Sequence, residues 1–471
     1  MSTNILGIPS TDKYSGSDLG SLRRQVFTKY PNRGMSLTGI LSLVDTEKVN
    51  HVKISWFEDY FRYWGSTTRG TNPLTKTAPS TGDADDGTVA TTTEVSDITA
   101  SVYMKVASTV DYRLGQIVSI DPSGINLQFR VLAVTRGAAS DVLKGYLTLQ
   151  PVRAIASYVG TNYTAGTQLP VVASAFGQGS TVTKGLGATI PEEISNYVQL
   201  FRTPMQFTIE ALKTPMRFDK SGIYAREARK KVQEHMCALE AAILFGKRSA
   251  SRRTVLNSLD SSNDSDGKEI LYTMSGLVEL IQAYDAGSTG ITVDGATYAP
   301  FAHKSAALTD DDEEKRLITN SDGLMTYDRL AEWMRRANSS SAQVTTDRLG
   351  ICGQKVVMAL NKMARNETSQ ILATKDKVFG LDMTSVLLPT GTLHLVTHPM
   401  FNSQFGMANS LLICNPSEMQ LRPMIDTQLR KNIQNKKSLL REDEFVTSAT
   451  LETHSIDSNV FVKNCGTYQA S

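Results

Sequence analysis

One segment of the sequence has a clear helical period over an unusual length. Between residues 222 and 245, side chains suited to a helix interior recur at steps of three and four: Ala228, Val232, His235, Leu239 and Ile243. This spacing places them on one stripe of an α-helix. At about 1.5 Å per residue the helix would be a rod of roughly 36 Å. Ser221 is the predicted N-cap and Gly246 the predicted stop. The chain must fold around a rod that is long for a globular protein.

Patterns of strands and shorter helices surround this segment. Val52, Ile54 and Trp56 alternate with polar residues, which predicts a strand. Further β-prone stretches are 116–120, 127–134, 146–152, 196–212, 349–352, 384–388, 393–396 and 410–414. Helices are expected over 270–285, 326–338 and 353–366, and Leu330, Trp333, Met334 and Ala337 share a face of the second. Residues 421–463 are typical of two strands around a tip at 430–437 that is rich in Lys, Arg and Asn. The predicted fold class is α+β.

Three stretches carry too little apolar surface to build a core. Residues 1–34 are polar and mixed, and predict an extended arm. Residues 65–97 and 160–190 are rich in Gly, Ser and Thr, and we expect extended segments there. They flank the β-rich residues 98–159, which predict a small antiparallel barrel or hairpin module. An insertion of this length between two well-patterned segments is usually functional.

Composition limits the classes of partner and compartment. The 471 residues include 49 basic and 47 acidic side chains, so any contact with nucleic acid should be weak or local. The cysteines, more than fifty residues apart, form no CxxC pair and predict free thiols in a reducing compartment; they are Cys237, Cys352, Cys414 and Cys465. No signal peptide and no apolar run of the roughly 20 residues that span a bilayer are recognised. We expect the protein to be made and assembled in a cytoplasm.

The sequence lacks the signatures of nucleotide-binding and hydrolytic sites. Gly246 and Lys247 lack the upstream glycine and strand of a P-loop, and Val182 stands where a third glycine would follow Gly177 and Gly179 in a dinucleotide fingerprint. No G-x-S-x-G elbow occurs. His394 and His398 are the closest histidine pair, but Pro399 and a strand-like setting favour a structural role.

Two acidic segments are candidate cation sites. Asp83, Asp85 and Glu94 match positions 1, 3 and 12 of a calcium loop, but Gly87 and Thr88 break positions 5 and 6. A solvated loop is the favoured interpretation, as it is for the run from Asp310 to Glu314. A nucleic-acid barrel in the β module is disfavoured, because its aromatic residues are few: Tyr103, Tyr112, Phe129 and Tyr146. We therefore predict no catalytic residues, no cofactor-binding residues, no metal ligands and no cofactor.

The order of these segments resembles a known family. A polar arm, a long insertion, one long helix, a mixed α+β region and a returning strand pair resemble the Hong Kong 97-type fold of tailed-phage major capsid proteins. Local likeness to the branch with an inserted β module lies in Leu41-Ser42-Leu43, in Val49 to Asp59, in Asn196 to Phe201, and in Leu239-Glu240 with Leu244-Phe245-Gly246-Lys247. The likeness covers roughly residues 35–64 and 170–465.

The resemblance implies an architecture. Residues 1–45 would be an N-terminal arm with its docking segment, and 46–190 an extended loop that carries the β module at about 98–159. Residues 191–270 would be a peripheral domain with the spine helix at about 222–245. Residues 271–420 would be an axial domain, and 421–471 would return as strands to the peripheral domain. Some family members form isopeptide cross-links, but no Lys–Asn pair is assigned here.

The resemblance also implies a function, namely a structural major capsid protein and not an enzyme. Copies would form hexamers and pentamers of an icosahedral or prolate head around double-stranded DNA, assembled in the host bacterial cytoplasm. Expected partners are other copies and a portal protein, with a scaffolding or cement protein as a further candidate, loose contact to packaged DNA and none to a membrane. The alternatives are another virion protein, of the tail or decoration class, and a hydrolase with a β-rich accessory domain.

Overall fold

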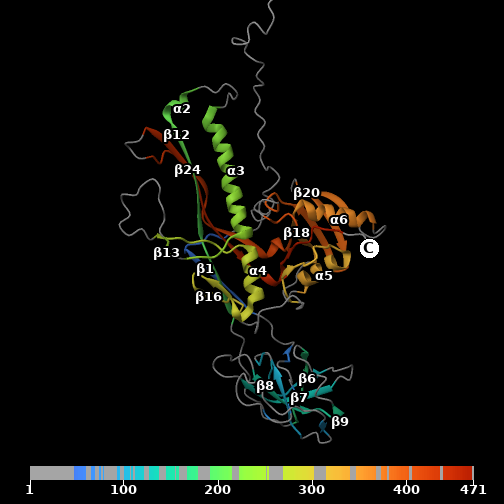
Figure 1. The fold of residues 1–471 in the computed structure, drawn as a ribbon. Coiled ribbons are helices and arrows are strands. Elements are labelled where there is room, and N and C mark those ends of the chain that lie inside the picture. Colours follow the sequence, from blue (N-terminus) through green and yellow to red (C-terminus); the bar gives the residue numbers. More distant parts are fainter. Residues whose placement is uncertain are drawn as a thin grey trace, which may run out of the picture.

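The fold is described from a computed structural model of the chain (Figure 1). The described residues are 47–59, 65–68, 74–75, 78, 93–95, 100–106, 108–109, 112–120, 127–136, 145–153, 155–158, 167–178, 191–214, 222–250, 252–253, 269–301, 314–339, 346–366, 373–378, 381–402, 406–434 and 439–468. The predicted arm at 1–34, the proposed cap Ser221, and Asp83 and Asp85 of the tested calcium loop lie outside these residues.

The first described strand confirms the predicted alternation. Strand β1 (Lys53–Glu58) pairs antiparallel with β11 (Glu192–Tyr197), so that Trp56 faces Ile194 and Phe57 faces Glu193. Ile54 and Trp56 are buried, while Lys53, Ser55 and Phe57 are exposed. The strand pair therefore has one face in the core and one face in solvent.

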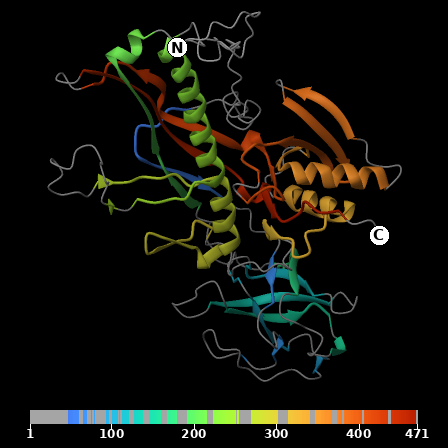
Figure 2. The same ribbon diagram turned by 45° about the horizontal axis from the view of Figure 1, so that its top comes forward.

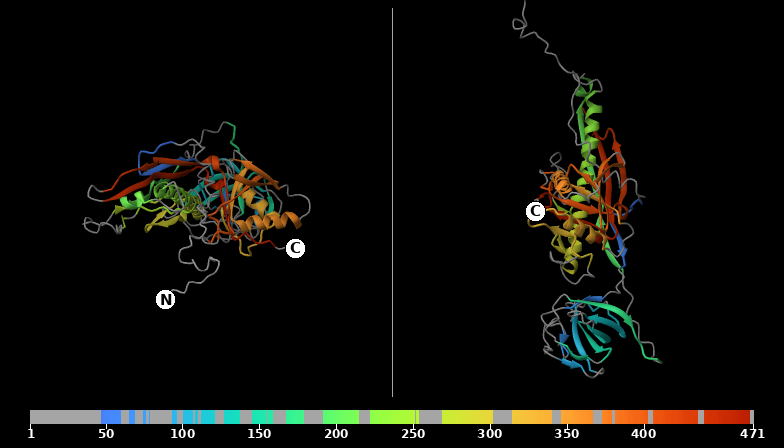
Figure 3. Two further views of the ribbon diagram at one scale, coloured as in Figure 1. Left: turned by 90° about the horizontal axis from the view of Figure 1, so that it is seen from above. Right: turned by 90° about the vertical axis from the view of Figure 1, so that its right-hand side faces the viewer.

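Between β1 and β11 the chain forms a separate β module. Its strands are β2 (Gly65–Thr67), β3 (Leu74–Thr75), β5 (Val102–Val106), β6 (Gln116–Ile120), β7 (Leu127–Arg136), β8 (Gly145–Pro151) and β10 (Gln168–Ser174), in the order β2-β10-β6-β7-β8-β5-β3. A bridge between Thr68 and Val106 joins the β2 end of this sheet to β5. The sheet thereby curls into a small barrel, shown in the right-hand view of Figure 3.

The barrel is larger than the sequence predicted. The three strands expected within 98–159 are confirmed as β6, β7 and β8. The expectation that 65–97 and 160–190 are wholly extended flanks is wrong, because β2, β3 and β10 belong to the barrel sheet and β4 (Thr93–Val95) pairs with β9 (Ile155–Tyr158). Leu169 and Val171 of β10 lie in the barrel core with Phe129, Val131 and Leu149. Their burial gives β10 the energy to order despite its Gly-rich surroundings.

A three-stranded antiparallel sheet lies along the long helix. Its order is β12 (Gln199–Thr208), β24 (Leu440–Thr453) and β23 (Met419–Arg430). Helix α3 (Gly222–Phe245) packs on one face of this sheet, as Figure 2 and the left-hand view of Figure 3 show. The short helix α2 (Ile209–Lys213) follows β12, which corrects the prediction of β structure through residue 212. The hairpin predicted within 421–463 is confirmed by β23 and β24, and β25 (Val460–Lys463) follows it.

Helix α3 has the predicted bounds but only part of the predicted buried stripe. His235, Leu239 and Ile243 are buried, whereas Val232 is 41% exposed. The sheet covers the first half of the helix only along the line of Tyr224 and Ala228, which pack with Phe207 and Phe445. The helix ends before Gly246, as predicted, and a Cβ atom there would collide with the carbonyl oxygens of Ala242 and Met274.

The remaining described chain forms a mixed seven-stranded sheet with helices. Its strands run in the order β17 (Leu317–Thr319), β25, β22 (Leu411–Cys414), β18 (Arg348–Cys352), β21 (Gly391–Thr397), β20 (Leu381–Leu388) and β19 (Ala373–Val378). Helices α5 (Tyr327–Asn338) and α6 (Gln354–Asn366) confirm the predictions for 326–338 and 353–366. Helix α4 (Leu277–Ala286) begins later than the predicted residue 270, because 269–270 form strand β14 with β13 (Arg252–Arg253).

The described chain also contains a short hairpin and three 3-10 turns. Strands β15 (Ile291–Val293) and β16 (Ala296–Tyr298) form a hairpin, and the 3-10 turns are η4 (Gly287–Thr289), η5 (Pro416–Glu418) and η6 (Ile456–Ser458). One core cluster spans Trp56 and Ile194, Leu239 and Ile243 of α3, and Leu412 of the mixed sheet. This continuous core joins α3 to both sheets, whereas the barrel core is separate.

Candidate assembly surfaces

The two histidines that were candidates for a metal or catalytic site bond to other side chains of the fold. His398 Nε2 lies 2.7 Å from Glu240 Oε1, and both side chains are fully buried. His394 Nδ1 lies 2.9 Å from Ser385 Oγ on the neighbouring strand. Within the ranges that the structure describes, no three His, Cys, Asp or Glu side chains are placed to hold a metal ion. The two histidines are therefore not brought together as a ligand pair.

The Glu240–His398 contact joins α3 to the mixed sheet. The backbone N–H of Met400 donates to Nδ1 of His398 at 3.1 Å, so that nitrogen carries no proton. The ring proton is then on Nε2, which donates to the Glu240 carboxylate. Because the two residues are 158 positions apart, no local sequence pattern could have revealed this bond.

A second buried histidine fastens α3 to the three-stranded sheet. His235 Nδ1 lies 2.9 Å from Thr203 Oγ1 of β12, and its Nε2 lies 2.7 Å from Thr447 Oγ1 of β24. Thr447 Oγ1 in turn lies 2.8 Å from Thr427 Oγ1 of β23. Burial lowers the pKa of His235, which favours the neutral ring. The chain of polar contacts fixes the register of the helix across all three strands.

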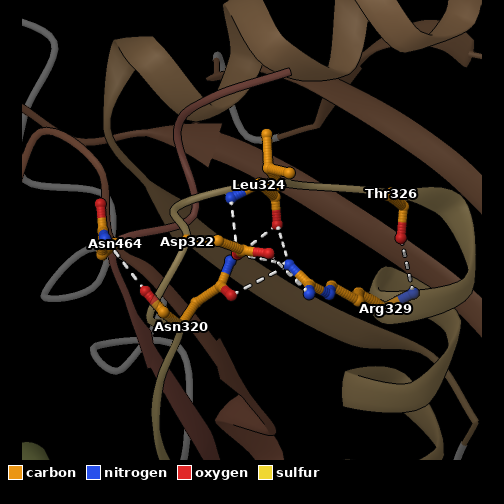
Figure 4. Close-up of polar contacts among 6 residues, drawn as sticks. All are labelled: Asn320, Asp322, Leu324, Thr326, Arg329 and Asn464. Carbon is orange, nitrogen blue, oxygen red and sulfur yellow. Dashed lines mark hydrogen bonds and ion pairs between the residues drawn. The ribbon is translucent and has the colours of Figure 1, made fainter. Parts of the chain in front are cut away.

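A polar clamp holds the start of α5, shown in Figure 4. The Arg329 guanidinium donates to both carboxylate oxygens of Asp322, at 2.6 and 2.9 Å, and also to Asn320 Oδ1 and Leu324 O. The hydrogen bonds from Arg329 hold the pKa of Asp322 at about 2. Thr326 caps the helix by accepting from the Arg329 backbone N–H at 3.3 Å. The turn is therefore fixed to the helix it precedes.

Arg248 forms a third fixed point, beneath β11. Its guanidinium carbon lies 4.6 Å from the ring centre of Tyr197 and 3.9 Å from that of Tyr298. Its Nη1 donates to Ser195 O at 2.6 Å, which Tyr298 also contacts through its hydroxyl group at 2.7 Å. This stacking ties the β15–β16 hairpin to β11.

The exposed face of the three-stranded sheet carries charge across its strands. Glu444 in the central strand is buried and accepts from Arg202 of β12 at 2.6 Å and from Arg430 of β23 at 3.3 Å. Arg422 similarly joins Glu452 and Glu47, at 2.5 and 2.6 Å. These pairs lie on the face opposite α3, which also carries the exposed apolar side chains Leu200 and Ile425.

Exposed apolar side chains gather at three other places. Phe57 on β1 is 68% exposed beside Glu193. Ile209, Ile433 and Leu439 are 44%, 37% and 81% exposed where α2 and the β23–β24 hairpin end. On the barrel, Phe176 packs over Gly115 and is 51% exposed, with Leu132 at 37% nearby. Single exposed apolar side chains are common on protein surfaces, whereas a group of neighbouring ones, such as Ile209, Ile433 and Leu439, is typical of a contact site with another protein.

Free thiols were predicted and are confirmed. None of the four cysteines forms a disulfide, and all four are described. Burial raises the pKa of Cys352 and of Cys414 to about 12, so these thiols stay protonated. Among the described helices, none combines the length and apolar character that crossing a bilayer requires.

Comparison with known proteins agrees with an assembly protein. The sequence model of the SU10 major capsid protein family matches residues 20–465. Solved structures with distant likeness include Microbacterium phage Oxtober96, at 9% identity and a TM-score of 0.42 over 96% of this chain and 98% of that chain. Another is the capsid of a native GTA particle, at 9% identity and a TM-score of 0.37 over 62% and 80%. A third is the cyanophage Pam1 capsid, at 11% identity and a TM-score of 0.35 over 63% and 83%.

No curated protein sequence matches the chain. The assignment rests on the family model, which spans nearly the whole sequence, and not on the distant structural likenesses. The capsid resemblance and the α+β, Hong Kong 97-type fold class predicted from the sequence are confirmed. The chain belongs to the SU10 major capsid protein family and is a structural subunit of a capsid shell, not an enzyme.

Proposed function

We propose that copies of this subunit form the hexamers and pentamers of an icosahedral or prolate phage head that encloses double-stranded DNA. The observation that carries the proposal is the family match over residues 20–465. The near-neutral net charge of +2 supports it, because a shell must enclose DNA without holding it tightly. Assembly would take place in the host bacterial cytoplasm, where the free thiols stay reduced.

The proposed division of labour follows the order of the elements. Residues 1–45 would act as an arm toward neighbours, and 46–190 as an extended loop that presents the barrel. Residues 191–270 would form the peripheral domain with α3, 271–420 the axial domain, and 421–471 the returning strands. Support comes from the continuous core around α3 and from the separate barrel core between β1 and β11. The barrel strands run from Gly65 to Ser174, so the inserted module would be longer than 98–159.

Other proteins are proposed to complete the head. A portal protein would occupy one vertex, and a scaffolding or cement protein could set the size or reinforce the shell. Individual contacts between copies would be weak, because ordering of arms and loops costs conformational entropy. Closed rings then multiply these contacts, so the finished shell is stable while misplaced copies can still dissociate.

The test is to express the chain in a bacterial host and to image the purified product by negative-stain microscopy. Closed shells or capsomer rings are the expected product. Tubes with a constant diameter would indicate a tail protein. A monomer that binds only to pre-formed heads would indicate a decoration protein. Either of these last two results would overturn the proposal.

A further inference from the structure

We infer that two surfaces at opposite ends of the three-stranded sheet bind each other between neighbouring copies of this chain. The acidic surface consists of Phe57 and Asp59 of the β1 segment with Glu193 of β11. The basic tip consists of Ile209 and Lys213 of α2 with Lys431, Ile433 and Leu439 of the β23–β24 hairpin. The inference rests on the proposed shell function and names the residues that one of its contacts would use.

The acidic surface presents one aromatic ring among carboxylates. The β1–β11 register places Phe57 directly opposite Glu193, on the solvent face of the strand pair. Phe57 is 68% exposed, and Asp59 follows two residues later and is also exposed. Hydrogen bonds from Ser55 and Lys53 lower the pKa of Glu193, so it is charged at neutral pH. On the other side of the same two strands, Glu58 lies opposite Glu192 in the register. These two carboxylates add negative charge behind the surface.

The basic tip presents aliphatic side chains among cations. The register that pairs Thr208 with Leu440 brings the start of α2, with Ile209, next to Leu439. The backbone N–H of Ile433 donates to Glu442 O at 2.9 Å, which extends the hairpin to this residue. Residues 430–441 include five basic side chains and no acidic one. Lys213 and Lys431 are exposed beside the apolar residues.

The two surfaces cannot meet within one copy. Strand β12 separates them, and its ten residues at about 3.3 Å each span roughly 30 Å. Figure 1 shows β1 and α2 at opposite ends of this sheet. A contact between the acidic surface of one copy and the basic tip of the next is head-to-tail, and such contacts form a ring where the rotation from copy to copy closes.

The apolar residues favour a protein partner over nucleic acid at the tip. Phosphate groups are bound by cations and hydrogen-bond donors, and an exposed leucine and two exposed isoleucines add nothing to that contact. An apolar patch opposite an exposed phenylalanine excludes water and makes the surrounding ion pairs stronger. Some of these charges are paired within the chain: Lys53 bonds to Glu193 in the acidic surface, and Arg430 and Arg441 of the hairpin bond to Glu444 and Asp443. The charges left over, from Asp59 on one surface and from Lys213 and Lys431 on the other, are opposite in sign.

A mixing experiment tests the pairing. One variant reverses the acidic surface (Asp59→Lys with Glu193→Lys), and the other reverses the basic tip (Lys213→Glu with Lys431→Glu). Each variant alone would place like charges opposite each other and should give at least tenfold fewer shells or rings. In an equimolar mixture every reversed surface can meet a surface of opposite charge, so six-membered rings of alternating copies should return, whereas a ring of five cannot alternate. A chain with all four changes should also assemble. Circular dichroism and thermal unfolding of each variant check that it folds.

Cross-linking tests the contact directly. Phe57→Cys with Leu439→Cys, oxidised with copper phenanthroline, should give intermolecular disulfide ladders in assembled particles and none in unassembled subunits. The control is Met358→Cys with Leu439→Cys, because Met358 is 60% exposed on α6 and belongs to neither surface. Ladders of equal strength in the control would overturn the pairing.

The outcomes separate this inference from the proposed function. If the wild-type chain forms no shells or rings, the proposed function itself is wrong. If the wild type assembles but the mixture of reversed variants does not, the pairing of these two surfaces is wrong. If the tip variant assembles normally but its heads package less DNA, the basic tip faces nucleic acid and the inference is overturned.

Discussion

At the scale of single residues, burial determines which parts of α3 tolerate change. Leu239 is 3% exposed in the central core, whereas Val232 on the same helix is 41% exposed. We expect Leu239→Asp to lower the free energy of unfolding by about 4 kcal/mol, because it buries a charge without a partner. Val232→Asp is the matched control and should change it by less than about 1 kcal/mol. Chemical denaturation of both variants measures the difference, and equal effects would show that the core does not enclose Leu239.

A second residue-scale prediction concerns pH. His454 Nε2 lies 3.0 Å from Glu452 Oε1, and this hydrogen bond raises the pKa of His454. A raised pKa in the folded state means that the stabilisation is full below the unfolded value of about 6.5 and is lost as the pH rises through the folded value. His454→Gln keeps a donor and removes the charge; the edge contact of the ring with Trp56 is also lost, but that loss is the same at every pH.

This variant should therefore be less stable than the wild type at pH 5.5 and nearly as stable at pH 8.5. The imidazole is 43% exposed, so solvent screening limits the effect to about 0.5 kcal/mol. Thermal unfolding across this pH range measures the difference. A stability gap that grows with pH would contradict the assigned pairing with Glu452.

At the scale of elements, the clamp of Figure 4 determines how firmly α5 begins. Arg329→Lys keeps the charge but removes the two parallel bonds to Asp322, because an ammonium group has no fork. We expect faster hydrogen exchange of the backbone amides from Leu324 to Leu330. Arg335→Lys on the same helix is the control, since Arg335 bonds to Glu332 of its own helix and its side chain is 40% exposed. Unchanged exchange in the Arg329 variant would show that the cap at Thr326 is sufficient.

The stabilisation that the contact between Arg329 and Asp322 provides should depend on pH. Because the pKa of Asp322 lies at about 2, below its ordinary value, its contribution is present above about 3.9 and is lost as the pH falls toward 2. Protection factors at the start of α5, which correct each measured rate for the intrinsic pH dependence of amide exchange, should fall in that window in the wild type and remain constant in Asp322→Asn.

Sequence periodicity predicted most elements because each has one side in a core. Helices α3, α5 and α6 and strands β1, β18 and β21 all repeat their apolar residues at the expected period. Strand β10 was missed because Pro170 interrupts a short segment between Gly-rich stretches, although Leu169 and Val171 face the barrel core. The period of three and four residues places Val232 on the same side of the helix as Leu239. It does not show how much of that side the neighbouring sheet covers, and so Val232 was wrongly predicted to be buried.

Tertiary pairs could not be predicted at all. The bond from His398 to Glu240 and the bridge from Arg202 to Glu444 each join residues more than 150 positions apart. The acidic surface likewise depends on the pairing of Phe57 with Glu193, which a single sequence does not encode as a local pattern. These contacts follow from the topology, and the sequence patterns gave the elements but not the pairs.

At the scale of the whole molecule, assembly and folding should be separable. Residues 1–34 are polar and mixed, and by composition they carry too little apolar surface to build a core. A chain that lacks residues 1–34 should therefore unfold at the same temperature as the full chain, and yet yield monomers or rings in place of closed shells. Calorimetry and negative-stain microscopy measure the two properties on one sample. Normal shells from the truncated chain would show that the arm is not an assembly element.

The insertion between β1 and β11 should respond to assembly more than any other part. Its barrel has a core of its own, so its fold does not depend on neighbours. By composition, its Gly-, Ser- and Thr-rich stretches at 76–92 and 179–190 offer few apolar side chains for a core, and we predict that they contact another copy in the particle.

We expect proteases to cut unassembled subunits within these two stretches and to leave assembled particles intact there. Mass spectrometry of a time course on both states locates the cuts. The barrel strands provide the internal control, because β6, β7 and β8 should resist cleavage in both states. Equal cutting at 76–92 and 179–190 in subunits and in particles would mean that the insertion projects freely from the shell. The contacts that hold the particle together would then lie on α3, the two sheets and the arm.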